Sequence, residues 1–316
     1  MGKFGVFVDR QTLSSSNQLQ SLIRFRDIAE SMGHEFYFLF PNEIHKIKTL
    51  NGLFIRSKTD PMNISYVASR IAELNGVKVI DDSKSIQICA DKINMYLHMM
   101  KNNVPLPKTK FLRKSENNIE NLKSIVEEIG LPLILKEPST SFSMRVEKVN
   151  SLEEFSKVAS RFLRLSDVLV AQEFIETRFD WRVGILNGEV IYACKYLIPK
   201  ETFKIQDCVD GHRVYCMVES VMFDEVPKEV VNTALKAANA VGTGLYGVDL
   251  KEKDGSIYVI EVNDNPSLET TEDEFYPEAY SNIVSYIMDD SRQKYPGGKM
   301  KFSEVIDPDG VANDRN

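Results

Sequence analysis

Three oxygen-bearing side chains in the last third of the chain could together bind a metal ion. Asp249 ends the apolar run GLYGVD, and Glu261 and Asn263 lie two residues apart on the next apolar run. The turn dipeptide Asp254-Gly255 between the runs predicts a β-hairpin that sets Asp249 roughly opposite Glu261. Carboxylate and amide oxygens are ligands that Mg²⁺ prefers. A solvated hairpin face is the alternative, but unpaired charges at the ends of apolar runs are costly, which favours a magnesium site.

Two lysines in apolar surroundings could bind phosphate groups. Lys136 ends the run LPLIL, and Lys92 opens a helix after Asp91. A lysine at the end of a buried strand can direct its ammonium group at a phosphate as a point charge. The segment PSTSFSMRV (138–146) follows Lys136, and its backbone amides and hydroxyls could cradle phosphate in the same way as a glycine loop. Taken singly, each feature is also typical of a surface lysine or of a polar turn.

The first hundred residues must provide a scaffold for these groups, and they alternate between short apolar runs and helical patterns. This alternation favours a parallel sheet covered by helices. The expected strands span 4–8, 35–40, 52–56 and 77–81, and the expected helices span 17–33 and 65–75.

A different pattern follows the linker Val104-Pro105-Leu106-Pro107, which cannot continue a helix. Two hairpins are expected, one turning at Asn187-Gly188 and one at Asp254-Gly255. The remaining elements are helices at 115–129, 151–164 and 227–242 and strands at 131–137, 145–149 and 168–175. We therefore predict an α/β N-terminal domain over 1–105 and an α+β domain over 106–290, with subdomains at about 106–175 and 176–290. The polar tail over 291–316 is expected to be loosely ordered.

Composition narrows the class of protein. The hydrophobic fraction of 43% and the charged fraction of 27% are typical of soluble globular chains. A net charge of -7 argues against a nucleic-acid partner. No apolar stretch approaches the roughly 20 residues that cross a bilayer, so no membrane partner is expected. Cys89, Cys194, Cys208 and Cys216 form no CxxC pair, which favours reduced thiols in a cytoplasmic protein.

The order of these motifs resembles the ATP-grasp superfamily. The nearest likeness is to the branch around the RimK glutamate ligase and bacterial glutathione synthetase, and it covers about residues 85–290. Single motifs are weakly specific, whereas six in the family's order are strong evidence. They are Asp91-Lys92, LPLILKEPSTSFS (131–143), VLVAQEFI (168–175), DWRVGIL (180–186), GLYGVDL (244–250) and VIEVNDNPSLE (259–269).

The resemblance implies an ATP-grasp fold, in which two subdomains clasp ATP, and a role for each matching residue. Lys92 and Lys136 match the lysines that hold the nucleotide phosphates, and the serine-rich loop with Ser141 and Ser143 matches the lid over them. The adenine and ribose positions fall on Gln172, Glu173, Phe174, Ile175 and Asp180. The metal ligands fall on Asp249, Glu261 and Asn263, for Mg²⁺ with Mn²⁺ as a second candidate. The catalytic positions fall on Arg182, Lys195 and Lys204, with Gln206 beside the cofactor.

The reaction implied by the resemblance joins a carboxylate to an amine. A substrate carboxylate takes the γ-phosphate of ATP to form an acyl-phosphate, and an amine then displaces phosphate. The carboxylate is expected on an amino acid, a peptide or a protein C-terminus, glutamate is the first candidate for one partner, and relatives form homodimers or homotetramers.

Two departures from the family concern the acceptor. Lys195 stands where many relatives have arginine, and Lys204-Ile205-Gln206 stands for an Arg-x-Asn triplet. A lysine cannot make the two-pronged contact of arginine to phosphate or carboxylate, so the departures bear on acceptor specificity. Three alternatives remain: a nucleotide-binding regulatory protein without ligase activity, a small-molecule kinase, and a structural or interaction protein. The intact set of metal-ligand candidates favours the ligase.

Overall fold

The computed structural model describes residues 1–141, 143–199, 202–204, 206–209, 212–268 and 276–289. Of the side chains in strands β11 and β12, including Gln206 and Cys208, none is described. The predicted tail over 291–316 lies outside the described residues. Within the described part of the chain, no helix has the length and hydropathy needed to cross a membrane.

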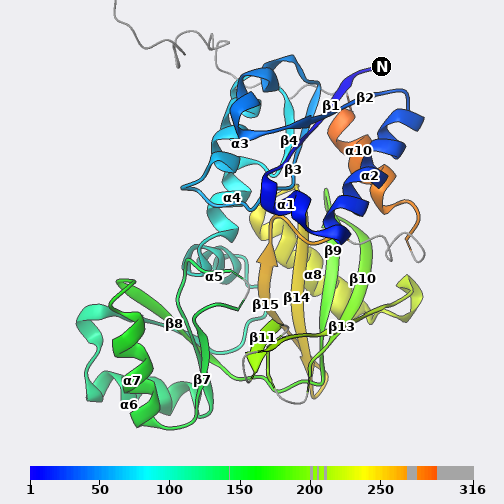
Figure 1. Ribbon diagram of the computed structural model, residues 1–316. Helices are drawn as coiled ribbons and strands as arrows, with labels where there is room; N and C mark the ends of the chain where they lie inside the picture. The colour runs from blue at the N-terminus through cyan, green and yellow to red at the C-terminus, as the bar shows by residue number, and fades with distance from the viewer. Residues whose placement is uncertain (142, 200–201, 205, 210–211, 269–275, 290–316) are drawn as a thin grey trace, which may run out of the picture.

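The N-terminal unit is a parallel sheet with helices on both faces, as predicted from the alternating pattern (Figure 1). Its strand order is β2-β1-β3-β4. Neighbouring residues of each strand point to opposite faces, so α2 packs on one face with Phe4 and Val6, and η1 and α3 pack on the other with Phe7. The strands are β1 (Lys3–Phe7), β2 (Glu35–Leu39), β3 (Gly52–Ile55) and β4 (Lys78–Ile80). The helical segments are α1 (Arg10–Ser14), α2 (Ser16–Ser31), η1 (Pro41–Thr49), α3 (Ile64–Leu74), α4 (Ser83–Cys89) and α5 (Lys92–Lys101).

The last described helix, α10 (Ala279–Met288), returns to this first sheet and lies beside α2 (Figure 1). Its apolar side packs into the core formed by Phe4, Phe25 and Phe54. The rings of Phe25 and Tyr280 are 4.5 Å apart between centroids, and the Tyr280 hydroxyl donates to Ser21 Oγ at 3.1 Å. The two ends of the described chain are therefore joined in one core.

A small antiparallel sheet forms the second unit, with order β5-β8-β6-β7. Helices α6 and α7 cover one of its faces, and their apolar residues form a separate core with those of the sheet. The elements are β5 (Thr109–Arg113), η2 (Lys114–Glu116), α6 (Ile119–Ile129), β6 (Leu133–Lys136), β7 (Val146–Val149), α7 (Leu152–Phe162) and β8 (Val168–Glu173).

The third unit is an antiparallel sheet of order β13-β10-β9-β14-β15, and α8 packs on one of its faces. Both predicted turns are confirmed by positive φ angles, which two-residue hairpin turns require. The φ angle is 51° at Asn187 and 79° at Gly188, and it is 52° at Asp254 and 76° at Gly255. The elements are β9 (Phe179–Leu186), β10 (Glu189–Leu197), β13 (Met217–Ser220), η3 (Phe223–Glu225), α8 (Lys228–Val241), β14 (Leu245–Lys253) and β15 (Ser256–Asn263).

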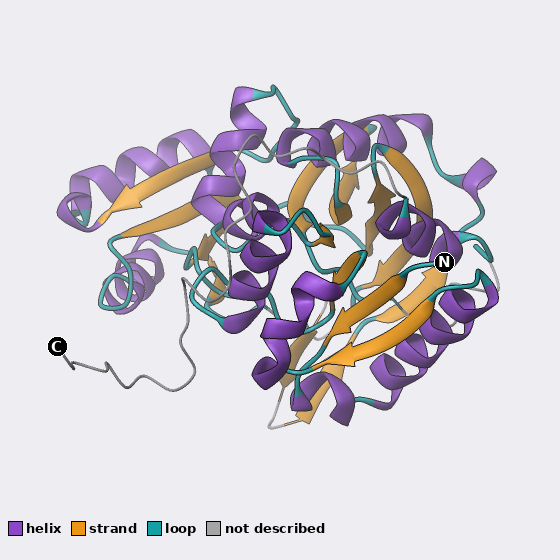
Figure 2. Cartoon of the chain, turned by 90° about the horizontal axis from the view of Figure 1, so that it is seen from above, coloured by secondary structure: helices purple, strands orange, loops and turns teal. Residues whose placement is uncertain are grey.

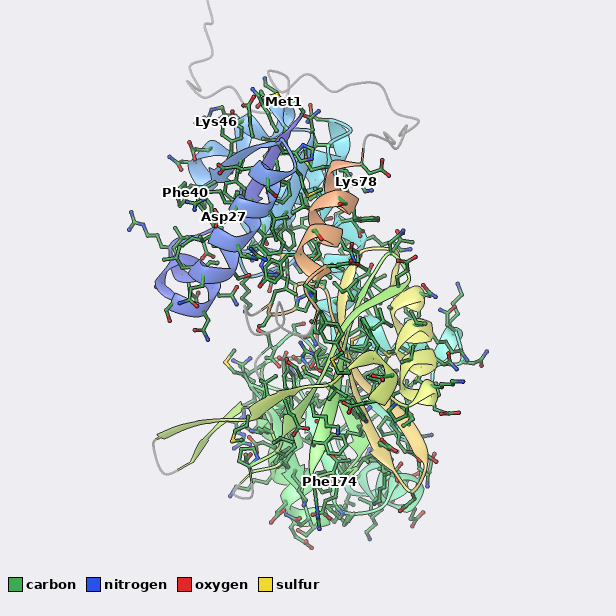
Figure 3. The ribbon with its side chains drawn as sticks, turned by 90° about the vertical axis from the view of Figure 1, so that its right-hand side faces the viewer. Met1, Asp27, Phe40, Lys46, Lys78 and Phe174 are labelled. Carbon is green, nitrogen blue, oxygen red and sulfur yellow. The ribbon has the colours of Figure 1, made fainter. Side chains whose placement is uncertain are left out.

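A separate two-stranded ribbon, β11 (Gln206–Val209) with β12 (His212–Tyr215), projects away from the large sheet (Figure 3). Seen from above, most helices lie along the outer sides of the sheets (Figure 2). This arrangement leaves the helix-free faces of the small and large sheets turned toward each other, and the candidate site lies between them.

Candidate active site

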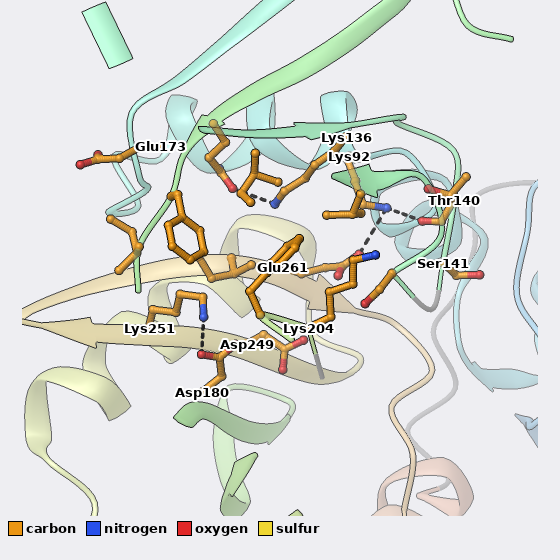
Figure 4. Close-up of a pocket in the computed structure, with 18 residues that line it drawn as sticks. Lys92, Lys136, Thr140, Ser141, Glu173, Asp180, Lys204, Asp249, Lys251 and Glu261 are labelled. Carbon is orange, nitrogen blue, oxygen red and sulfur yellow. Dashed lines mark hydrogen bonds and ion pairs between the residues drawn. The ribbon is translucent and has the colours of Figure 1, made fainter. Parts of the chain in front are cut away.

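One pocket between the small and the large sheet gathers most of the predicted site residues (Figure 4). The small sheet and its loops contribute Lys136, two serines and the strand end of β8, helix α5 contributes Lys92, and the large sheet contributes the acids. The predicted residues that line the pocket are Lys92, Lys136, Ser141, Ser143, Gln172, Glu173, Phe174, Ile175, Asp180, Lys204, Asp249 and Glu261. Residues far apart in the chain thus form a single cavity.

The two predicted lysines are buried and face into the pocket. Lys136 ends β6, and its Nζ donates to the Tyr96 hydroxyl at 2.8 Å and to Gln172 Oε1 at 2.7 Å. Both partners are neutral, and burial lowers the pKa of Lys136 to about 8, although Glu261 and Asp180 act in the opposite direction. A cation held by neutral groups in a buried site lacks a counter-charge, and an anion in the pocket would supply one.

Lys92 occupies the first turn of α5, where Asp91 caps the helix by accepting from the Asn94 amide at 2.9 Å. Its Nζ donates to the backbone carbonyl of Thr140 and lies 3.7 Å from Glu261 Oε1. Lys92 therefore connects the serine-rich loop to the acid side of the pocket.

The serine-rich loop joins β6 to β7 and contacts Lys92 through the Thr140 carbonyl. Thr140 Oγ1 holds the turn together by bonding to the carbonyls of Glu137 at 3.2 Å and Met144 at 2.8 Å. The hydroxyl oxygen of Ser141 is buried and has no hydrogen-bond partner among the described residues. A buried hydroxyl without a partner costs free energy, so this loop has capacity to bind a polar ligand.

The opposite end of the pocket is apolar. Phe174, just beyond β8, and Phe203 meet edge to face with ring centroids 5.9 Å apart, and Ile134, Ile175 and Ile260 also line the cavity. Aliphatic and aromatic walls beside a strand end suit a flat heteroaromatic ring, which agrees with the adenine position expected at Gln172–Ile175.

The predicted acids meet as expected from the hairpin. Asp249 on β14 pairs directly with Glu261 on β15, and Asn263 Nδ2 donates to Asp249 Oδ2 at 3.1 Å. Arg182 on β9 binds both oxygens of Asp249, at 2.5 and 2.8 Å, and both side chains are buried. Burial raises the pKa of Asp249, and the attraction of Arg182 offsets part of that rise.

The fit of this group to a metal ion can be judged from its donor atoms. The described residues contain no cluster of three or more His, Cys, Asp or Glu side chains suited to a metal. The predicted set instead has two carboxylates and one amide. Mg²⁺ needs only one or two protein carboxylates when waters and substrate phosphates complete its shell, so the set fits Mg²⁺ shared with a nucleotide.

Three predicted residues do not line the pocket, and the side chain of a fourth, Gln206, lies outside the described residues. Arg182 and Asn263 reach the pocket only through Asp249. The expectation that Lys195 faces the pocket is corrected, because Lys195 lies on the other face of the large sheet. It pairs directly with Trp181, and its Nζ is 5.0 Å from the ring centroids of Trp181 and of Phe179.

The reason for that correction is a local irregularity in β10. Without it, the two-residue turn would pair Lys195 with Asp180, which lines the pocket. The register shifts between Val190 and Tyr192, and a shift of one residue moves a side chain to the opposite face.

Lys251 lines the pocket and was not predicted. Its Nζ donates to Asp180 Oδ1 at 2.5 Å and to Thr177 Oγ1 at 2.8 Å. The sequence could have predicted this position of Lys251, because Lys251 lies two residues after Asp249 on one strand and must share its face. Thr140 and Phe203, also in the lining, carry no comparable signal.

Gly247 explains how Arg182 can approach Asp249. A Cβ at this position would lie 3.0 Å from Arg182 Nη1 and 2.8 Å from the Cβ of Pro266. Both distances are below ordinary contact distance, so only glycine leaves room for the guanidinium and the segment after β15.

Comparisons with known proteins cover most of the chain. Residues 89–287 match the model of the RimK-like ATP-grasp domain. A protein of Vibrio vulnificus named "Probable alpha-L-glutamate ligase" is 24% identical over 295 residues, which is 87% of this chain and 93% of that protein.

Two solved structures show a similar fold. D-alanine–D-alanine ligase from Bacillus anthracis superposes with a TM-score of 0.69 at 19% identity, over 92% of this chain and 97% of that one. A RimK-domain ATP-grasp protein from Sphaerobacter thermophilus has a TM-score of 0.66 at 15% identity, over 90% and 98% of the two chains.

Proposed function

Because this chain belongs to the RimK-like ATP-grasp domain family, we propose that it is an ATP- and Mg²⁺-dependent ligase that joins a carboxylate to an amine through an acyl-phosphate. The ATP-grasp fold expected from its motifs is confirmed. The observation that carries the proposal is one pocket in which two buried lysines, Lys92 and Lys136, face the acids Asp249 and Glu261. That arrangement suits a polyphosphate accompanied by a metal ion.

ATP fits the pocket as a substrate. Phe174 and Ile175 would contact the adenine, and Asp180, held by Lys251, would accept from the ribose hydroxyls. Lys92 and Lys136 would neutralise phosphate oxygens, and the free hydroxyl of Ser141 would donate to them. Each contact uses a group that the structure places in the lining of the pocket.

Asp249, Glu261 and Asn263 would hold the metal. When bound there, Mg²⁺ would supply positive charge against the negative charge that builds up during phosphate transfer. Arg182 fixes both oxygens of Asp249, so it acts as a positioning residue for this carboxylate. Lys195 has no part in this scheme, since it lies on the opposite face of the sheet.

The reaction then has two bond exchanges. A substrate carboxylate oxygen bonds to the γ-phosphorus, and the bond from that phosphorus to the bridging oxygen of ADP breaks. The amine nitrogen next bonds to the acyl carbon, phosphate departs with the former carboxylate oxygen, and the nitrogen loses a proton. Lys204, which extends into the pocket (Figure 4), would stabilise negative charge at both stages. The serine-rich loop would keep water from the acyl-phosphate.

L-Glutamate is the first candidate for the amine substrate. The support is the name of the relative in Vibrio vulnificus, which aligns over 87% of this chain. The carboxylate partner would be an amino acid, a peptide or a protein C-terminus.

The experiment is Mg²⁺-dependent release of ADP, with L-glutamate and pooled amino acids and dipeptides as substrates. Glu261→Gln should abolish release, because it removes a charge that the metal and Lys92 both face. Glu189→Gln is the matched control, because it makes the same change at an exposed position of β10. Circular dichroism and thermal unfolding should show an intact fold in both variants.

Near-normal turnover in Glu261→Gln would contradict the proposed metal site. Binding of ATP without ADP release from any pool would favour the regulatory alternative. A stable phosphorylated product without an amine would identify a kinase.

A further inference from the structure

A group of buried polar side chains lies at the carboxyl edge of the first sheet, outside the ATP pocket. Arg56 and Ser57 directly follow β3, and Asp81 directly follows β4. These strands are parallel neighbours, and Phe54 pairs with Ile80, so the residues that follow them emerge side by side. Open parallel sheets bind ligands at this edge.

The segment after β15 closes this edge from the other side. Arg56 Nη1 donates to Asn265 Oδ1 at 2.6 Å and to the carbonyl of Pro266 at 2.9 Å. Asn265 Nδ2 donates to the carbonyl of Ser57 at 2.7 Å. Asp264 belongs to the same segment and hydrogen bonds with Thr59. The first sheet therefore meets the chain directly after Asn263, a proposed metal ligand.

Several oxygen atoms here are buried and unsatisfied. Asp81 is 1% exposed, and neither of its carboxylate oxygens has a hydrogen-bond partner among the described residues. The same holds for Asp264 Oδ2 and Ser57 Oγ, in residues that are 8% and 2% exposed. Burial raises the pKa of Asp81, the charge of Asp264 raises it further, and Arg56 opposes both. Unpaired polar groups in such a place are costly and often mark a functional site.

The missing partner must supply several hydrogen-bond donors and positive charge. A primary ammonium group offers three donors and one positive charge, which matches two carboxylates and a hydroxyl. The ligase reaction requires one amine substrate next to the acyl-phosphate, and Asp264 adjoins Asn263.

We propose that Asp81, together with Asp264 and Ser57, binds the ammonium group of the amino-acid substrate and so selects an amine as the second substrate. This inference rests on the proposed ligase function and adds the recognition of the amine to it. Asp81 would act on the substrate itself from the sheet of the N-terminal unit, which contributes only Lys92 of α5 to the lining of the ATP pocket.

The test measures binding rather than turnover. Isothermal titration in the presence of Mg²⁺ and a non-hydrolysable ATP analogue compares L-glutamate with glutarate, which has the same two carboxylates and no amino group. The wild type should bind L-glutamate at least about tenfold more tightly than glutarate, as charged hydrogen bonds predict. Asp81→Asn should remove this preference and leave affinity for the ATP analogue within about twofold.

Two further variants make the comparison specific. Asp82→Asn removes a charge one residue away, and asparagine still caps α4, so it should keep the preference for L-glutamate. Ser57→Ala should weaken it by a few fold, at about the size of one neutral hydrogen bond. Asp81→Asn should fold at least as stably as the wild type, because it removes an unpaired buried carboxylate.

The outcomes separate this inference from the proposed function. An unchanged preference in Asp81→Asn overturns the inference, and so does a wild type that binds no amino acid from a full set. If the wild type releases ADP and the variant keeps the wild-type KM for the amine, the ligase stands and the inference fails. If the wild type releases no ADP but its preference for L-glutamate disappears in Asp81→Asn, the site stands and the ligase fails.

Discussion

At the scale of single residues, charge in apolar surroundings was the most informative signal. Lys92, Lys136, Asp249 and Glu261 all adjoin apolar runs, and all four line one pocket. The pattern worked because a charge at the end of a buried strand must either find a partner or serve a ligand. The same pattern did not single out Asp81, although Asp81 also ends an apolar run, VKVID. The reason is that the sequence does not reveal which buried acids lack hydrogen-bond partners.

Lys136 makes a prediction for pH. Its pKa in the folded protein is about 8, below the ordinary value of 10.5. The unfolded chain thus binds more protons between these values, so folding stability should rise with pH from about 8 to 10.5. Phosphate favours the charged lysine, so ATP affinity should be level below pH 8 and should fall above it.

Calorimetry of ATP binding between pH 7 and 9.5 checks this, with buffers of different ionisation enthalpy to count the protons taken up. Lys136→Arg is the matched control, because arginine stays charged over this range and should remove the decline. A wild-type affinity that does not change up to pH 9.5 would count against the assignment of Lys136 to phosphate.

At the scale of elements, two irregular pairings decide which side chains face the pocket. In the hairpin of β14 and β15, a shift next to Asp249 brings it opposite Glu261. In the hairpin of β9 and β10, a shift after Val190 turns Lys195 to the other face. Turn dipeptides and apolar runs predicted both hairpins, but neither signals an extra residue within a strand. The family resemblance assigned both Glu261 and Lys195 to the site, but Glu261 lines the pocket and Lys195 does not.

Gly247 gives a prediction at this scale. Gly247→Ala should displace Arg182 and the segment at Pro266, because the added Cβ would lie 3.0 Å and 2.8 Å from them. We expect a loss of stability of about 1–3 kcal/mol, typical of overpacking, and a weaker Mg²⁺-dependent binding of ATP. Thermal unfolding and titration with Mg²⁺ and an ATP analogue measure the two effects.

Val248→Ala separates stability from the site. Val248 follows Gly247 on β14, and its side chain is fully buried in the core on the opposite face of the large sheet. Its truncation should therefore lower stability and leave nucleotide affinity unchanged. If both variants weaken nucleotide binding equally, Gly247 has no special relation to Arg182.

At the scale of the molecule, one core joins segments from opposite ends of the described chain. It contains Phe4 and Val6 of β1, Ile283 and Ile287 of α10, and Leu186 of the large sheet. The strand–helix alternation predicted the parallel sheet, but no local pattern indicated that α10 would pack against it. Such a contact depends on which apolar faces remain uncovered after the other elements have folded.

Ile283→Ala tests the role of this core. The side chain is fully buried, so the substitution should lower the free energy of unfolding by about 2–5 kcal/mol. Asn282→Ala, at an exposed position of the same helix, should change it by less than about 0.5 kcal/mol. Urea unfolding followed by circular dichroism provides the values.

The same experiment reports on cooperativity. The single tryptophan, Trp181, lies in the core of the large sheet. Its fluorescence should change at the same urea concentration as the circular dichroism of the wild type, since the shared core couples the units. Separate transitions would show that α10 stabilises the first sheet alone.

The position of α10 also bears on how the chain folds during its synthesis. A protein leaves the ribosome from its N-terminus, and a domain made of consecutive residues can fold as soon as it emerges. Here β1 and α2 are translated well before α10, the helix that covers part of their apolar surface. The parallel sheet is therefore completed only after the other two units have been made. Until α10 has emerged, the nascent chain exposes that surface, which is the kind of surface that chaperones bind.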